Sequence, residues 1–176
     1  PLTVVAGVRY DVHTFINATV SPRVAVLYAP NPDHTFRVSA SIAYRPPTLL
    51  ESMAESLVTT NPPLPPTTTS VLGSPNLSPE RIISYEAGYQ GWYLKHRVRF
   101  RADAFFNHIS DLISVRNQSA TVAVYSNDPG SADIYGGEVG VEVLATKWLT
   151  GFANYSYQEI DQTFTGRIQR AGPRNK

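Results

Sequence analysis

The histidine and acidic residues of this sequence show none of the spacings that catalysis or metal binding requires. No two of the four histidines (His13, His34, His96 and His108) are spaced as in a metal-binding motif. The chain has no cysteine, which excludes thiolate metal sites and a cysteine nucleophile. No set of nucleophile, histidine and acid is recognisable, and YGGEVG does not precede a predicted helix, as a dinucleotide-binding loop would. The sequence therefore predicts no enzyme, no cofactor and no metal site.

The charged residues recur instead at every second position along predicted strands. Arg97, Arg99, Arg101 and Asp103 alternate with apolar residues over 98–106. Such a period of two indicates a β-strand that has one polar and one apolar face. The chemistry available to this polar face is ion pairing between neighbouring strands, and the same alternation places Arg9, Glu86, Glu138 and Glu142 on polar faces.

The alternation extends over nearly the whole chain and predicts about seven strands. They cover residues 2–11, 22–29, 36–45, 83–90, 97–107, 135–145 and 149–158. Short links (30–34, 94–96 and 146–148) alternate with long polar ones (12–19, 46–79, 117–133 and one that begins near Glu159). This pattern predicts an antiparallel up-and-down meander with two unlike ends. Residues 49–57 are consistent with one short helix inside a long link.

Two architectures share this alternation: a soluble sandwich and a barrel in lipid, whose apolar side chains face outward. Only 16% of the residues are charged, against about 25% in an average soluble domain. The predicted strands are long enough to cross a bilayer, and aromatic residues lie near their ends, as at membrane interfaces. A loop as long as 46–79 is uncommon in compact soluble domains. These features favour the barrel, with the soluble sandwich as the alternative.

The charge and the apolar runs limit the class further. A net charge of +1 gives no indication of nucleic acid as a partner. No apolar run approaches the roughly 18 residues of a membrane helix, and no secretory signal opens the chain.

Several short motifs resemble, in order, those of TonB-dependent outer-membrane receptors. LGSPNLSPERIISYEAGYQ (72–90) is similar to the family's "GNPNLKPE…YELGY" signature. GVRYD (7–11), SPR (21–23) and FRVSASIAYRPPTLLE (36–51) resemble upstream strands of the family. YGGEVGVEV, FANYSYQ and the terminal RAGPRNK resemble downstream ones. Each motif is degenerate alone, and the ordered set spans nearly the whole chain.

The resemblance implies an all-β fold, in which the seven strands form part of a 22-stranded transmembrane barrel. The family's plug domain, TonB box, signal peptide and closing aromatic-ended strand have no counterpart in residues 1–176, so we expect a fragment of the barrel domain. Residues 46–79, which hold eight of the 14 prolines, would form a long extracellular loop.

The resemblance also implies a function: import of a scarce ligand, most often a ferric siderophore, across the outer membrane of a Gram-negative bacterium. The partners would be that ligand, outer-membrane lipid, and TonB through the missing plug. Candidate ligand-binding residues in the outer loops are Arg45, Glu51, His108, Asp111, Arg116, Tyr125 and Asn127, since arginine pairs with anionic chelates and tyrosine stacks on aromatic ones. The expected lumen-facing residues are Arg9, Glu86, Arg97, Arg99, Arg101, Asp103, Glu138 and Glu142.

Two other functions remain open at this point. The first is a passive porin or an adhesin-type barrel, which the family-ordered motifs disfavour. The second is a soluble β-sheet module that binds glycans or protein, which would be soluble without detergent.

Overall fold

The computed structural model describes residues 1–13, 16–60 and 67–164, and RAGPRNK lies outside them. The chain begins with β1 (Leu2–Asp11), β2 (Thr19–Asn31), β3 (His34–Arg45), α1 (Leu49–Met53), β4 (Glu55–Thr60) and β5 (Thr67–Leu72). It continues with β6 (Glu80–Tyr93), β7 (Val98–Ser110), β8 (Ile113–Asn117), β9 (Val122–Asn127), β10 (Ser131–Thr146) and β11 (Leu149–Gln162). Seven of these strands are long and four are short.

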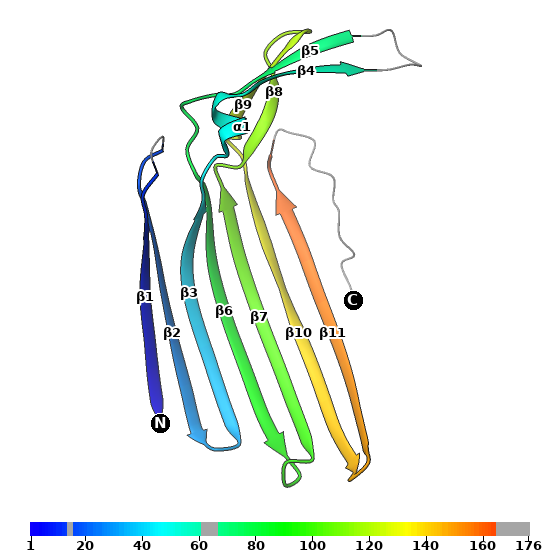
Figure 1. Cartoon of the computed structure of the whole chain (residues 1–176). Coiled ribbons are helices and arrows are strands. Elements are labelled where there is room, and N and C mark those ends of the chain that lie inside the picture. The colour runs from blue at the N-terminus through cyan, green and yellow to red at the C-terminus, as the bar shows by residue number, and fades with distance from the viewer. Residues whose placement is uncertain (14–15, 61–66, 165–176) are drawn as a thin grey trace.

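The seven long strands form one antiparallel sheet in the order β1-β2-β3-β6-β7-β10-β11 (Figure 1). The hairpins β2–β3, β6–β7 and β10–β11 close at one end of this sheet, here called the turn end. The opposite end, here called the loop end, carries α1 and a second sheet in the order β4-β5-β9-β8. The predicted meander of about seven strands with unlike ends is confirmed.

β1 matches its predicted limits, whereas most of the other long strands extend beyond theirs, and the seven are between 10 and 16 residues long. β2, for example, begins at Thr19 rather than at 22, and β6 runs from Glu80 to Tyr93 rather than from 83 to 90. Antiparallel pairing satisfies the backbone groups of these extra residues, which the side-chain alternation alone does not mark. β11 likewise continues to Gln162, past the point where a link was predicted.

The predicted helix over 49–57 was wrong in its second half, because α1 ends at Met53. Ala54 is extended, and its carbonyl accepts a hydrogen bond from the Gly73 N–H. The segment from Glu55 onward pairs with β5 over Glu55↔Leu72 to Thr60↔Thr67. Its β-branched Val58 and Thr59 suit a strand better than a helix.

The two longest links are not irregular, as the prediction implied, because they build the second sheet together. β5, from the first link, pairs in parallel with β9, from the second, through Ser70↔Val122 and Leu72↔Val124. β8 and β9 form a hairpin of their own. A contact between segments about 50 residues apart leaves no local sequence signal.

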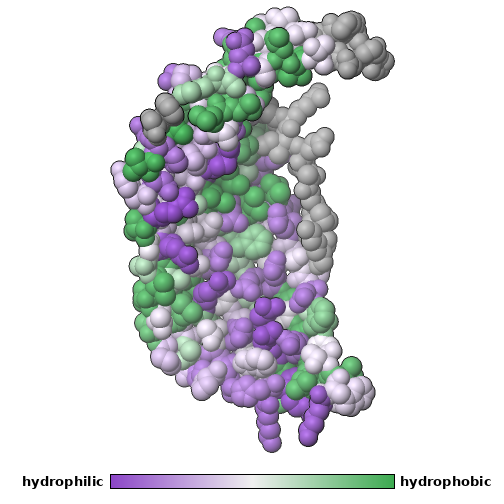
Figure 2. Space-filling model, viewed as in Figure 1, coloured by the Kyte–Doolittle hydropathy of each residue, from purple (hydrophilic) through white to green (hydrophobic). Residues whose placement is uncertain are grey.

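The register of the long sheet separates an apolar face from a polar face. On the apolar face, one row across the strands is Ala40↔Tyr85, Tyr85↔Phe106 and Phe106↔Tyr135. On the polar face, a row is Arg37↔Gly88, Gly88↔Asp103 and Asp103↔Glu138. Figure 2 shows hydrophilic side chains over the lower central strands and hydrophobic ones along the left margin of the molecule.

The described residues enclose almost no hydrophobic core. The buried apolar residues among them are Leu77, Ala123 and Ala132, and the second and third of these are small. Large apolar side chains of the apolar face are exposed instead, including Val4 at 61% and Val38 at 59%. A sheet of this kind gains its hydrophobic stabilisation only from an apolar surrounding.

The described part of the chain contains no helix with the length and apolarity that a membrane-spanning helix needs.

Candidate functional site

The most connected polar cluster lies at the loop end and is centred on Arg45, the last residue of β3. Its guanidinium donates to Glu80 at the start of β6 (Nε–Oε2 2.5 Å and Nη2–Oε1 2.7 Å). It also donates to Glu51 in α1 (3.1 and 3.2 Å). The side chains of Glu51 and Glu80 are only 14% and 13% exposed, whereas that of Arg45 is 45% exposed. One arginine thus pairs with two nearly buried carboxylates.

Glu51 is also the acidic member of a capping box that starts α1. Its carboxylate accepts from the Thr48 N–H (2.7 Å) and Oγ1 (3.0 Å), while the Glu51 N–H donates to Thr48 Oγ1 (3.3 Å). Burial of Glu51 opposes ionisation, but hydrogen bonds from Arg45 and Thr48 outweigh it and lower the pKa of this carboxyl below its ordinary value. The five-residue helix therefore depends on this carboxylate.

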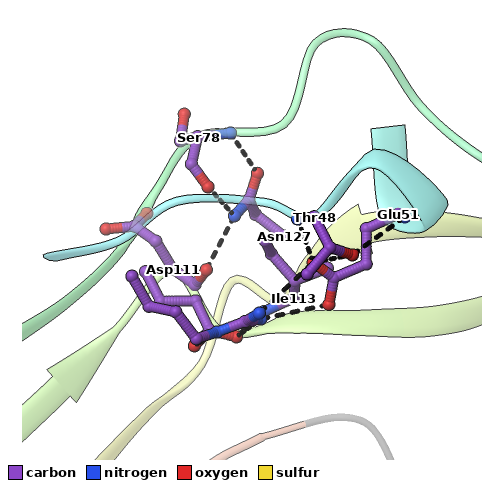
Figure 3. A network of polar contacts seen from close by, with 8 residues as sticks. Thr48, Glu51, Ser78, Asp111, Ile113 and Asn127 are labelled. Atoms are coloured by element: carbon purple, nitrogen blue, oxygen red, sulfur yellow. Dashed lines mark hydrogen bonds and ion pairs between the residues drawn. The ribbon is translucent and has the colours of Figure 1, made fainter. Parts of the chain in front are cut away.

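Glu80 and Asn127 extend the cluster to β8 and β9. Glu80 Oε1 accepts from the Ile113 N–H (2.8 Å). Asn127 bonds both backbone groups of Ser78, accepting from its N–H (2.8 Å) and donating to its carbonyl (2.9 Å), and it also donates to the Asp111 carbonyl (2.6 Å). Figure 3 shows Asn127 between Ser78 and Asp111, with Thr48 and Glu51 beside it.

These contacts, here called the rim network, join α1, β8, β9 and the segment before β6 to the ends of β3 and β6. The rim network contains four of the seven predicted ligand-binding residues: Arg45, Glu51, Asp111 and Asn127. Their polar groups already have partners within the protein, and Asp111, with φ of 59°, contributes its carbonyl at a tight turn. The arrangement fixes the second sheet on the loop end.

The other three predicted ligand-binding residues lie in different places. Arg116 and Tyr125 belong to the second sheet, where they pair with Val124 and Val115. His108 lies on the apolar face of β7, and its Nδ1 is 2.7 Å from Asp133 Oδ1 on β10. His108 therefore lies outside the rim network and outside the second sheet.

The polar face of the long sheet carries ion pairs between its strands. Arg37 Nη2 lies 3.4 Å from both Glu86 and Asp103, and Arg99 pairs with Glu142. Arg9 pairs with Asp11 within its own strand, at 2.7 Å. Register places Arg101 and Glu138 on the same face. Arg97 differs, because it precedes β7 and donates to the Leu144 (3.2 Å) and Ala145 carbonyls at the turn end.

An open hollow lies on this polar face between β7 and β11. Arg101, Gly140 and Asn154 line it, and Gly140 makes room for the Asn154 amide, which lies where a Cβ would be (2.8 Å). Phe152 also lines the hollow and is 80% exposed. Polar and aromatic groups are both available at this part of the wall.

Sequence reasoning missed Glu80, Arg37 and Phe152 as members of these sites. Glu80 stands in the LSPE motif and Arg37 alternates with apolar residues, so both carried a local signal. Phe152 lies on the polar face of β11, opposite Glu142. An aromatic residue is not expected on that face, so its residue type carried no signal. Within the described ranges, no group of three or more histidine, aspartate and glutamate side chains is placed to hold a metal ion.

A family model described as the TonB dependent receptor-like β-barrel matches residues 1–175, almost the entire chain. This chain belongs to the TonB-dependent receptor β-barrel family. The resemblance of the motifs is therefore confirmed, and so is the membership of the sheet in this all-β fold. TonB-dependent receptors are transporters rather than enzymes, in agreement with the absence of a catalytic motif.

Solved structures of similar fold include siderophore receptors. The ferric enterobactin receptor PfeA from Pseudomonas aeruginosa, in complex with enterobactin, aligns with a TM-score of 0.75 and 18% identity, over 90% of this chain and 24% of that one. The siderophore receptor PirA from the same organism gives 0.74 and 19%, over 90% and 28%. PirA from Acinetobacter baumannii gives 0.72 and 22%, over 89% and 25%. No curated protein matches the chain significantly.

The chain thus spans about a quarter of the length of these TonB-dependent receptors. At these identities the likeness shows the fold and not the ligand. Both free edges of the sheet, β1 and β11, are where the other strands of a closed barrel would pair.

Proposed function

We propose that this chain is part of an outer-membrane active transporter that imports a ferric siderophore with energy from the TonB system. The observation that carries the proposal is the family match over residues 1–175. The exposed apolar face and the ion-paired polar face support it, because a barrel in lipid needs both. The location would be the outer membrane of a Gram-negative bacterium, and TonB would act through a plug domain.

Within this function, we assign the two groups of predicted residues different roles. The rim network would hold the second sheet in place over the mouth of the barrel, as part of an extracellular loop that covers 46–79. Arg116 and Tyr125, on that sheet, would contact the ligand, since arginine suits an anionic chelate and tyrosine an aromatic one. The ion pairs of the polar face would line the lumen and support the wall.

The test uses the full-length gene in a bacterium that lacks its own siderophore receptors. Iron-limited growth and uptake of radioactive iron are measured with ferric enterobactin, ferrichrome, haem and cobalamin, each in tonB-positive and tonB-deleted cells. We expect uptake of at least one ferric siderophore and its loss without TonB. Equal uptake in both strains would support the passive porin instead, and no uptake of any of these ligands would contradict the proposal.

A second measurement addresses the residue roles. Arg116→Gln and Tyr125→Ala are expected to raise the Kd for the transported siderophore about tenfold each, as the loss of one charge-assisted or stacking contact does. Asn127→Asp, which disturbs the rim network, should instead increase proteolysis of residues 46–79. Unchanged Kd values for both Arg116→Gln and Tyr125→Ala would remove the second sheet from the binding site.

A further inference from the structure

The apolar face of the long sheet changes character near the loop end. The row Tyr85–Phe106–Tyr135 is entirely aromatic. Closer to the loop end, the following row is Ile83–His108–Asp133, and the row after that is Arg81–Ser110–Ser131. The face that is apolar along most of the strands thus becomes polar within two rows of residues.

This change marks where the bilayer would end on the outside of the barrel. Aromatic side chains are enriched at the level of lipid headgroups, with apolar residues on one side and polar ones on the other. Tyr85 and Phe106 are in ring contact (6.5 Å between centroids) and are 53% and 39% exposed, so lipid can reach them. Arg81 lies two rows beyond, at the level of the headgroups.

Arg81 is a half-buried cation with an incomplete set of partners. Its Nε donates to Ser110 Oγ (3.2 Å), and none of the ion pairs among the described residues includes Arg81. Ser110 in turn donates to Asp111 Oδ2 (3.0 Å), so its hydroxyl holds the guanidinium in one position. The two terminal nitrogens of Arg81 have no acceptor among the described residues, and a guanidinium binds phosphate through such nitrogens.

The groups that face Arg81 from the neighbouring strands are compatible with an anion bound beside it, because the carboxylates among them already have partners. Tyr44 on β3 pairs with Arg81 in register, which places its phenol hydroxyl on the same face. His108 Nδ1 and Asp133 Oδ1 lie 2.7 Å apart, so the Asp133 carboxylate already has a polar partner on this face. The Asp111 carboxylate is held by Ser110, beyond the end of β7.

We propose that Arg81, oriented by Ser110, binds the phosphate group of a membrane lipid whose acyl chains lie against Ile83, Tyr85 and Phe106. The proposal rests on the membrane location proposed above. Its support is the positive charge of Arg81, which lies at the boundary between the apolar and polar rows and is complementary to a phosphate. Such a contact would anchor the barrel wall at the outer headgroup level, directly behind the rim network, since Arg81 follows Glu80 in the chain.

The experiment measures lipid binding to the full-length receptor, delipidated in a phosphate-free detergent. Dioctanoyl phosphatidylglycerol, dioctanoylglycerol without a headgroup phosphate, and inorganic phosphate are titrated separately, with the thermal unfolding midpoint as readout. Wild type should respond to phosphatidylglycerol alone. Arg81→Gln should weaken that binding about tenfold, since a hydrogen bond to a charged group is worth roughly 1.5–3 kcal/mol. Arg9→Gln, an arginine near the same end on the polar face, is the matched control and should bind as wild type.

Ser110→Ala serves as a second variant if Arg81→Gln fails to fold, and it should weaken binding about threefold by freeing the guanidinium. Equal binding by wild type, Arg81→Gln and Ser110→Ala would overturn the proposal, as would an equal response to dioctanoylglycerol. If inorganic phosphate competed with the lipid at matched concentration, the site would be one for a free anion, and the proposal would also be overturned. Siderophore uptake in cells is measured in parallel, so that a failure of lipid binding and a failure of transport are distinguished.

Discussion

Arg45 is the residue on which the loop end most depends, because it pairs with two carboxylates that are almost buried. Removing one partner of a buried pair costs more than the pair itself contributes, since the other charge stays desolvated. Neither Glu51 nor Glu80 has another cation within ion-pair distance among the described residues. The exposed pair Arg9–Asp11 provides a contrast, with the Arg9 side chain 69% exposed.

We therefore expect Arg45→Met to destabilise the packing of α1 and the second sheet by about 2 kcal/mol, between the values typical of exposed and buried pairs. Limited proteolysis of the receptor should then cleave residues 46–79 faster, by a factor of about 30 at this free energy. Arg9→Met is the control and should leave cleavage unchanged. Equal cleavage rates for the two variants would show that the rim network does not hold the loop.

At the scale of elements, the hairpin β10–β11 depends on a close approach at Gly136. A Cβ at this position would clash with the Tyr157 carbonyl and lie 2.9 Å from the Phe105 ring. Gly151, in the same hairpin, has open space within 4 Å of its Cβ position. Gly136 is therefore required by the lack of room for a side chain, whereas the space around Gly151 would accept one.

Gly136→Val should lower the free energy of unfolding by about 1–3 kcal/mol, the usual cost of forcing atoms into a packed position. Gly151→Val is the matched substitution, with the same change of side chain and room to accept it, and should have little effect. Thermal unfolding of the two variants in the same detergent, followed by circular dichroism, measures the difference. A lower midpoint for Gly151→Val than for Gly136→Val would contradict this account.

The short helix α1 should respond to acid through Glu51. The folded state lowers the pKa of this carboxyl below its ordinary value of 4.5, so its stabilising contribution is complete above pH 4.5 and is lost as the pH falls through the lowered value. Proteolysis within 46–79 by an acid-active protease should accelerate on acidification below pH 4.5. Glu51→Gln should cleave rapidly at neutral pH and show a weaker pH dependence. Cleavage of Glu51→Gln at neutral pH that is no faster than that of the wild type would exclude this role.

At the scale of the whole molecule, the seven-stranded sheet has two free edges and an exposed apolar face. Lipid tolerates neither open edge, and water does not favour the apolar face. The 176 residues alone should therefore aggregate when refolded without detergent, as measured by light scattering and size-exclusion chromatography. A monodisperse soluble monomer would contradict the membrane assignment and favour the soluble binding module.

The period-two alternation by itself determined the seven long strands and their polar and apolar faces, because side-chain direction in a strand is a local property, and the lengths of the links determined the unlike ends. The ordered motifs also determined the family. Only the tertiary structure decided the second sheet, since β5 and β9 pair across about 50 residues of chain. It likewise decided that Arg45, Glu51, Asp111 and Asn127 meet in one network. These positions depend on register and long-range pairing, which local residue types do not encode.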